Sequence, residues 1–161
     1  MSRAAYLKQA KTKAAKFCSS RERAPFEVIQ KLQKWELNDE EAQSVLAELV
    51  EERFVDEQRF CRAFCNDKFE FNRWGKVKIQ QALFQYHLPE EVIKEGLAVI
   101  DPEKYEAVLL ELASKKWHKV VGSAWDRKQK TLAYMLSKGF EMDLTFEALK
   151  KLEAMDASSQ K

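Results

Sequence analysis

The stretch QKLQKWELNDE at residues 30–40 has two counterparts further along the chain: QALFQYHLPEE at residues 81–91 and AYMLSKGFEMD at residues 133–143. Each is an apolar helix end, then a short turn closed by Leu37, Leu88 or Phe140, then an acidic start to a new helix. Aligned positions lie 51 and then 52 residues apart. A fixed period of this length predicts a stacked array, in which each unit buries its apolar face partly against its neighbours.

The apolar residues between these turns recur with the helical period of 3.6, and no stretch favours the period of a strand. Gly and Pro are scarce, at 4 and 3, which also favours helix. We therefore predict an all-α chain, an elongated tandem array of three three-helix units. The predicted boundaries are residues 1–53, 54–100 and 101–156, followed by a flexible tail at 157–161.

The helical wheel also predicts which aromatic residues enter the core of the second unit. Phe60, Phe64 and Phe71 fall on one arc of its first helix, so we expect them to be buried. Phe69 points away from that arc and is expected either to pack between units or to be exposed. The apolar face of the last helix is expected to comprise Leu144, Ala148, Leu149, Leu152 and Met155.

Charge alternates along the chain although the net charge is only +2. Residues 1–34 carry +7 and residues 35–60 carry −7; later basic and acidic blocks follow in phase with the repeat. If the units stack in register, the basic helices form a broken stripe suited to a polyanion or an acidic protein surface. The alternative is that opposite charges pair between neighbouring helices on solvated faces.

Several classes of protein are disfavoured by the sequence. It has no apolar run long enough to cross a membrane and no signal segment, which predicts a cytoplasmic protein. Three cysteines and two histidines without ligand spacing predict no metal and no cofactor. No phosphate-binding glycine loop or nucleophile motif occurs, so we expect no enzyme. With no long apolar heptad seam left over, a monomer is expected.

Three segments resemble a known family. ERFVDEQRFCRAF at residues 52–64 resembles the signature of the RecX family of regulatory proteins, in which an acidic pair, a basic residue and phenylalanine open the second unit. RWGKVKI at residues 73–79 and SRERA at residues 20–24 resemble that family's entries to the following helices. The chain departs from the family pattern at Glu36, where glycine is common, and in the helix at 26–35, where relatives are often richer in arginine.

The resemblance implies a non-enzymatic modulator of the RecA recombinase. Members bind the RecA filament on DNA, lie along its groove, and inhibit its ATP turnover and strand exchange. This implies a regulator of homologous recombination, DNA repair and the SOS response. Separately, the basic stripe predicts weak, salt-sensitive binding to single- and double-stranded DNA. The alternative is a helical-repeat DNA-binding or scaffold protein with no recombinase partner, and composition and charge alone do not separate the two.

The best candidate binding surface surrounds a glycine break at the start of a helix, where free backbone N–H groups favour anions. Its residues are Arg73, Trp74, Lys76 and Lys78; Trp74 either stacks on a base or packs between units. The wider stripe adds Arg21, Arg23, Lys115, Lys116, Lys119, Arg127, Lys128 and Lys130. The signature residues Asp56, Glu57 and Arg59 are expected to cap and tie a helix, and Phe60 and Phe64 to lie in the core.

Overall fold

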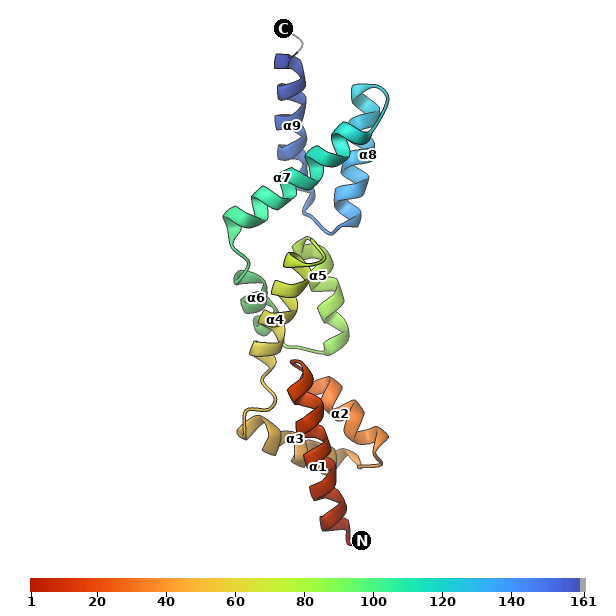
Figure 1. Cartoon of the computed structure of the whole chain (residues 1–161), viewed down its shortest axis with the longest axis vertical. Helices are drawn as coiled ribbons and strands as arrows, with labels where there is room; N and C mark the ends of the chain where they lie inside the picture. The colour runs from red at the N-terminus through yellow and green to blue at the C-terminus, as the bar shows by residue number, and fades with distance from the viewer. Residues whose placement is uncertain (160–161) are drawn as a thin grey trace. The chain divides into compact units, whose positions relative to one another are not determined.

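A computed structural model describes residues 1–159, and this part of the chain is helical without any strand, which confirms the all-α prediction (Figure 1). It contains nine α-helices and one short 3-10 helix. The helices are α1 (Arg3–Ser20), α2 (Pro25–Lys34), α3 (Asp39–Glu51), α4 (Glu57–Glu70), α5 (Lys76–Leu83), η1 (Phe84–Tyr86), α6 (Glu90–Ala98), α7 (Pro102–Lys119), α8 (Ala124–Ser137) and α9 (Met142–Ser159). We call α1–α3, α4–α6 and α7–α9 the first, second and third repeats.

Most helices begin at a polar residue that satisfies their first free N–H groups. Asn38 followed three residues later by Glu41 predicts a capping box from the sequence. The structure confirms it: the Asn38 side chain accepts from the Glu41 N–H at 2.8 Å, and the Glu41 carboxylate accepts from the Asn38 N–H at 3.0 Å. Asp101 caps α7, and Pro102 follows as its first residue. Capping of this kind makes these helices start at positions that the sequence specifies.

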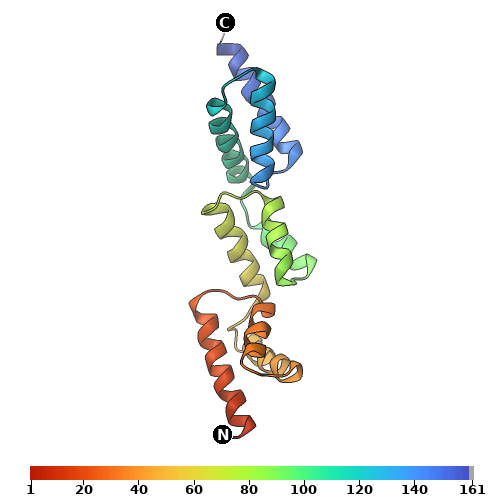
Figure 2. The same cartoon turned by 90° about the vertical axis from the view of Figure 1, so that its right-hand side faces the viewer.

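The chain forms two compact bodies, each with its own contacts. The N-terminal body comprises residues 1–64 and 83–96, and the C-terminal body comprises residues 65–82 together with the described residues from 97 onward. In the N-terminal body α1, α2 and α3 pack on one another; in the C-terminal body α7, α8 and α9 do so (Figures 1 and 2). Helix α4 continues from the first body into the second, so the predicted boundaries at 53/54 and 100/101 stay predictions.

The two cores differ in the size of their side chains. The core of the first repeat is built from Ala10, Ala14, Cys18, Val28, Leu32, Leu37, Ala42, Val45, Leu49 and Val55. The third repeat buries larger residues, among them Tyr105, Leu109, Leu112, Trp117, Met135, Phe140 and Leu152. Trp117 is 1% exposed and its indole N–H donates to the Asp156 carboxylate at 2.7 Å, so the ring buries no unpaired donor.

The repeated turn noted in the sequence has one backbone geometry in the first and third repeats. The Leu37 N–H donates to the Leu32 carbonyl at 3.2 Å, and the Phe140 N–H donates to the Met135 carbonyl at 3.1 Å. The residue before each closing residue is left-handed: Glu36 has φ 66° and Gly139 has φ 93°. These are the bonds of a Schellman helix end, which requires a left-handed residue at that position. His87, the aligned residue of the second repeat, is left-handed as well, at φ 55°.

Part of the predicted core was wrong. Phe71 is 82% exposed because α4 ends at Glu70, so Phe71 lies beyond the helix on which the wheel placed it. Phe69 is 3% exposed and its ring lies 5.6 Å from that of Tyr105, on α7, so of the two expectations for it the packed one is correct. Phe60 is buried as predicted, whereas Phe64 is only partly buried.

Three other details differ from expectation near helix ends. On α9, Leu144 and Met155 are 39% and 64% exposed instead of buried, whereas Thr145, beside Leu144, is fully buried. The apolar periodicity predicts one helix from about Lys76 to Tyr86, but α5 ends at Leu83 and a 3-10 turn covers residues 84–86. Helix α9 continues to Ser159, so the predicted tail is helical at residues 157–159; residues 160–161 lie outside the described part.

Candidate nucleic-acid interface

A close backbone contact between two glycines builds the candidate surface. In the C-terminal body, the Gly75 N–H donates to the Lys138 carbonyl at 2.8 Å and the Val77 N–H donates to the Gly139 carbonyl at 3.0 Å. The turn after α8 therefore supplies acceptors for the first free N–H groups of α5. A Cβ at Gly75 would overlap the Gly139 backbone, and one at Gly139 would overlap Lys78. Glycine at both positions lets the two segments approach this closely.

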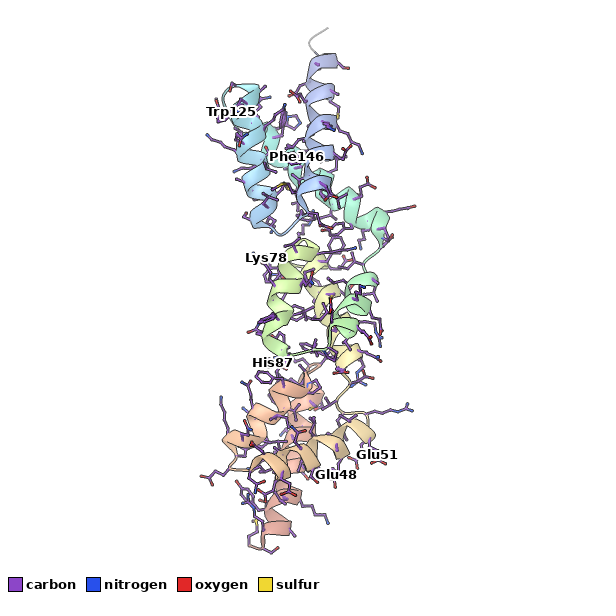
Figure 3. The ribbon with its side chains drawn as sticks, turned by 180° about the vertical axis from the view of Figure 1, so that it is seen from behind. Glu48, Glu51, Lys78, His87, Trp125 and Phe146 are labelled. Atoms are coloured by element: carbon purple, nitrogen blue, oxygen red, sulfur yellow. The ribbon has the colours of Figure 1, made fainter. Side chains whose placement is uncertain are left out.

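This contact brings three cations together. Lys138, the residue before Gly139, donates its ammonium to the Asn72 carbonyl at 3.0 Å. Burial lowers the pKa of Lys138, and the positive charges of Lys78 and Arg73 lower it further. Arg73 pairs with Glu111 at 3.0 Å, but among the described residues no carboxylate pairs with Lys78 or Lys138. We name Arg73, Lys78 and Lys138, with Lys68 and Trp74, the basic cluster; Lys78 is marked in Figure 3.

Trp74 holds two lysines of this cluster. The ammonium of Lys78 lies 4.5 Å and that of Lys68 4.9 Å from the centroid of its ring. A cation over an indole face is attracted by the ring quadrupole, so the indole gathers positive charge at this point. The ring is partly buried, as expected for a packing role, and lysines occupy the ring surface that a stacked base would need.

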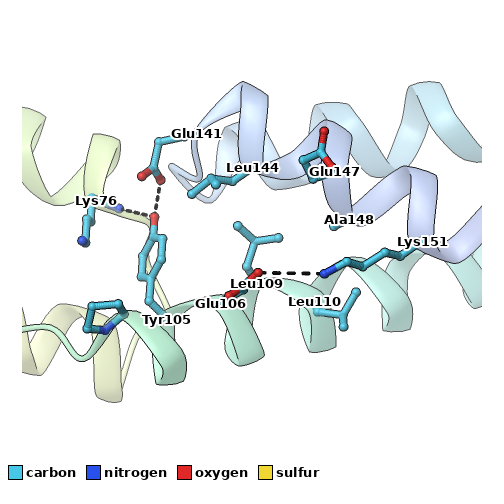
Figure 4. A pocket seen from close by; sticks show the side chains of 11 residues that line it. Lys76, Tyr105, Glu106, Leu109, Leu110, Glu141, Leu144, Glu147, Ala148 and Lys151 are labelled. Atoms are coloured by element: carbon cyan, nitrogen blue, oxygen red, sulfur yellow. Dashed lines mark hydrogen bonds and ion pairs between the residues drawn. The ribbon is translucent and has the colours of Figure 1, made fainter.

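Lys76 faces away from the cluster, toward a hollow of about 370 Å³ in the C-terminal body (Figure 4). Its ammonium lies 4.9 Å from the Tyr105 ring centroid, and its backbone N–H donates to the Tyr105 hydroxyl at 3.0 Å. That hydroxyl in turn donates to the Glu141 carboxylate. Burial and then the bond to Glu141 raise the pKa of Tyr105, so the phenol stays protonated. The structure thus places Lys76 in a structural contact and separates it from Arg73 and Lys78.

The predicted basic residues of the third repeat divide into paired and unpaired ones. Arg127 pairs with Asp156 at 3.3 Å, Lys128 with Glu153 at 2.9 Å and Lys115 with Glu111 at 3.2 Å. The Lys116 ammonium lies 5.3 Å from the Tyr134 ring centroid. Over residues 1–159, Lys119 and Lys130 are exposed and make no ion pair.

In the N-terminal body most of the predicted site residues have structural contacts. Arg21 pairs with Glu27 at 3.0 Å, and the Arg23 guanidinium lies 3.9 Å from the Phe17 ring centroid. Arg59 pairs with Glu22 at 2.7 Å. These contacts match the alternative in which charges pair between neighbouring helices.

The signature residues lie at the start of α4. The Asp56 carboxylate accepts from the Gln58 and Arg59 N–H groups at 3.0 Å each, the capping contact expected of it. Glu57 is the acidic residue in the first turn. Phe60 and Phe64 pack together with ring centroids 5.8 Å apart. These contacts hold the helix end and its aromatic face in place.

Sequence reasoning found Arg73, Trp74 and Lys78 but missed Lys138 and Lys68. Lys138 is 60 residues from Lys78 in the sequence, and only the Gly75–Gly139 contact brings it near. The available signal was the pair of glycines at two helix boundaries. Among residues 1–159, no cluster of His, Cys, Asp and Glu could hold a metal ion, and no helix is long and apolar enough to cross a membrane.

Models of the three RecX three-helix domains match this chain in order: the first at residues 10–49, the second at 56–97 and the third at 103–149. Together they cover most of the chain. It belongs to the RecX family. Membership confirms the resemblance carried by residues 52–64 and 73–79, and the three-unit helical array. The relatives are named as regulatory proteins, and nothing in the comparisons indicates a catalytic activity.

Two curated relatives illustrate the degree of similarity. The regulatory protein RecX of Clostridium acetobutylicum is 27% identical over 148 residues, covering 89% of this chain and 68% of the relative. That of Lactobacillus gasseri is 24% identical over 141 residues, covering 87% of this chain and 52% of the relative. This RecX-family chain therefore spans between about half and two thirds of the length of such relatives.

Solved structures agree in fold. The crystal structure of RecX from Lactobacillus salivarius superposes with a TM-score of 0.87 at 16% identity, covering 94% of this chain and 99% of that one. A second regulatory protein RecX gives a TM-score of 0.81 at 21% identity, covering 92% of this chain and 73% of that one. At these identities the likeness shows that the RecX fold is shared.

Proposed function

We propose that this chain binds the RecA recombinase filament on DNA and inhibits its ATPase and strand-exchange activity, as a cytoplasmic regulator of homologous recombination and DNA repair. Membership of the RecX family supports the regulatory role. The basic cluster supports the contact with DNA, because Lys78 and Lys138 are held close together without a carboxylate partner among the described residues. Binding of a polyanion reduces the repulsion between like charges that are held together in this way.

The cluster is a surface for phosphates. Arg73 supplies a planar guanidinium, and Lys78 and Lys138 supply ammonium groups without base-reading geometry. Such contacts are independent of nucleotide sequence, as a protein that follows a filament along any DNA requires. Binding to bare DNA should be weak and salt-sensitive, for single and double strands alike.

The test is RecA ATP turnover on single-stranded DNA with increasing amounts of this chain. We expect turnover to fall, and a variant with Arg73, Lys78 and Lys138 changed to Gln to inhibit at least tenfold less well at equal concentration. A matched variant with Lys8, Lys13 and Lys16 changed to Gln, all in α1, removes the same charge and should inhibit like the wild type. DNA binding without any effect on turnover would favour the alternative of a DNA-binding or scaffold protein with no recombinase partner.

A further inference from the structure

Phe71 is an exposed aromatic residue at the end of α4. Its side chain is 82% exposed, although aromatic rings are among the side chains whose burial stabilises a protein most. The Phe71 N–H donates to the Asp67 carbonyl at 2.9 Å, so the helical spacing is kept to this point. Phe69, two residues earlier, is buried. Phe71 therefore projects into solvent from the opposite side of the same turn.

The basic cluster surrounds this ring. Lys68 lies three residues before Phe71 on the same turn, which makes the two side chains neighbours. The next residue, Asn72, accepts a hydrogen bond from the Lys138 ammonium on its carbonyl at 3.0 Å. Arg73 follows, no more than about 7 Å from Phe71 along the backbone. All of them belong to the C-terminal body, so the ring lies within reach of the cations that we assign to phosphates.

The Phe71 ring is open where that of Trp74 is covered. Trp74 is partly buried and carries the ammonium groups of Lys78 and Lys68, at 4.5 Å and 4.9 Å from its centroid. Among residues 1–159, no cation and no other ring lies over Phe71. A base that stacks beside the basic cluster therefore finds its open face on Phe71 and not on Trp74.

Comparison between repeats shows that the fold does not require an aromatic residue here. The aligned residue of the first repeat, 51 positions earlier, is Ser20, which is exposed as well. The end of α1 forms with this small polar side chain, so the phenyl ring of Phe71 is not needed to end a helix. Its role is therefore to be sought in binding.

The surroundings of Phe71 favour a nucleic acid over a protein as its partner. An aromatic anchor of a protein interface is normally ringed by further contacts that exclude water. Phe71 is instead flanked on its own turn by the charged side chains of Asp67 and Lys68, and is followed by Asn72 and Arg73. A flat ring among cations suits a ligand that joins planar bases to phosphates, and Asp67 directs those phosphates to the other side of the ring.

We propose that Phe71 stacks on an unpaired base of single-stranded DNA whose phosphates lie on the basic cluster. The inference rests on the proposed function, which supplies the contact with DNA. Phosphate contacts alone hold single and double strands alike, whereas a ring stacks on a base only where the face of that base is open. Phe71 therefore adds affinity for single strands only, and it does so for any nucleotide sequence, because every base has such a face.

The experiment compares three variants of the full chain with the wild type. Phe71→Ser installs the residue of the first repeat, and Phe71→Trp keeps a ring that can stack. The control is Phe84→Ser, which removes a phenylalanine that is 84% exposed in the N-terminal body. Fluorescence anisotropy at one salt concentration measures the affinity for a single-stranded oligonucleotide, for an abasic strand with the same phosphates, and for a hairpin duplex. Thermal melts check the fold, and RecA ATP turnover is followed in parallel.

We expect the wild type to bind the ordinary single strand about five- to tenfold more tightly than the abasic strand, at the lower end of the range for one stacked base. Phe71→Ser should lose this difference and bind the abasic strand and the duplex as before. Phe71→Trp should retain it, and Phe84→Ser should match the wild type on all three probes. Because both phenylalanines are exposed, the melting temperatures should barely change.

Equal affinity of the wild type for the ordinary and the abasic strand would overturn the stacking contact alone, and this result needs no variant. Equal affinity of Phe71→Ser and the wild type for the single strand would do the same. A Phe71→Ser variant that binds every probe as before but inhibits RecA less would place the ring on the protein and so overturn the base contact. A wild type that binds none of the three probes would overturn the contact with DNA, and unchanged RecA turnover would overturn the proposed function as well.

Discussion

In the first repeat, Tyr6 is the fourth residue of α1 and donates its hydroxyl to the Trp35 carbonyl of the same repeat. In the third repeat, Tyr105 is the fourth residue of α7, but its hydroxyl bonds to the Lys76 N–H and the Glu141 carboxylate, and so ties α5 to α7 and α9. One position therefore serves a local turn in one repeat and a contact between repeats in the other.

The two repeats also treat their charges differently. In the first, basic α1 and acidic α3 neutralise each other: Arg3 pairs with Glu41 at 2.6 Å, and Lys11 pairs with Glu48 at 3.2 Å and Glu52 at 3.0 Å. Around the third, Lys138 and Lys78 repel each other. A basic segment in the sequence thus indicates a binding surface only where the fold places no carboxylate close enough to pair with its cations.

The largest effect is expected at the shared turn. Gly139→Ala forces a left-handed alanine, at about 1–2 kcal/mol, and overlaps Lys78, at about 1–3 kcal/mol, so the free energy of unfolding should fall by about 3–4 kcal/mol. Glu36→Ala changes the aligned residue without adding a left-handed side chain and should be nearly neutral. Urea denaturation compares the two, and a loss of only about 1–2 kcal/mol for Gly139→Ala would show that the left-handed conformation, and not the overlap with Lys78, sets the cost.

Next is the tyrosine pair. Tyr105→Phe leaves the Lys76 N–H and the Glu141 carboxylate without their partner, and should lower the free energy of unfolding by about 2 kcal/mol. Tyr6→Phe removes one bond at a more accessible position and should cost about half as much. Thermal melts followed by circular dichroism measure both; a costlier Tyr6→Phe would reverse the comparison.

The lack of carboxylate partners for Lys78 and Lys138 predicts how the affinity for DNA depends on salt. If Lys78 and Lys138 contact phosphates, changing both to Gln should reduce the slope of log affinity against log salt by about 1.5, at 0.7–0.9 per contact. Relief of their repulsion should leave the melting temperature unchanged or slightly higher. Lys8→Gln with Lys16→Gln removes the same charge from α1 and should leave the slope nearly unchanged. Equal reductions would mean that the whole basic stripe binds, not the cluster.

The paired charges of the first repeat predict a dependence on pH. The bidentate contact with Arg3, helped by the hydrogen bond from the Asn38 N–H, lowers the pKa of Glu41 from 4.5 to about 2. Because the folded pKa lies below the ordinary one, this contact stabilises fully above pH 4.5, and its contribution is lost as the pH falls toward 2. Glu41→Gln should flatten the loss of stability over that interval. An unchanged profile would show that the pair is screened by solvent in solution.

The smallest effect is expected at Glu36. Glu36→Gly relieves a left-handed side chain, worth about 1–2 kcal/mol, against an entropic cost of about 0.5–1 kcal/mol, so the protein should gain about 0.5 kcal/mol. The Glu36 carbonyl keeps its bond from Arg3, since only the side chain is lost. A denaturant midpoint below that of the wild type would show that the glutamate side chain contributes something that its exposure does not suggest.

Local signals predicted most of the fold. The capping box at Asn38 and the Asp101–Pro102 start of α7 lie where the sequence placed them, since a cap depends on residues three positions apart. The burial of Phe69 and the exposure of Phe71 were not predictable from the wheel, because they depend on where α4 ends and on Tyr105, 36 residues further on. A single-helix pattern carries no information on such neighbours.

Only part of the candidate site could be predicted from the sequence. Arg73, Trp74 and Lys78 are close in sequence and were found together, whereas Lys76, between them, faces Tyr105. Lys138 joins the cluster through the backbone contact of Gly75 and Gly139, which no periodicity reveals.

The contact between Gly75 and Gly139 bears on how such a chain can evolve. Both glycines allow one close approach: Gly75 lies against the Gly139 backbone, and Gly139 lies against Lys78, so this shared role is lost once either segment is gone. The two positions should be inherited as one character. A duplication of the third repeat alone would copy the Gly139 turn without the start of α5 that packs against it. The first repeat, whose turn tolerates Glu36, could be copied by itself.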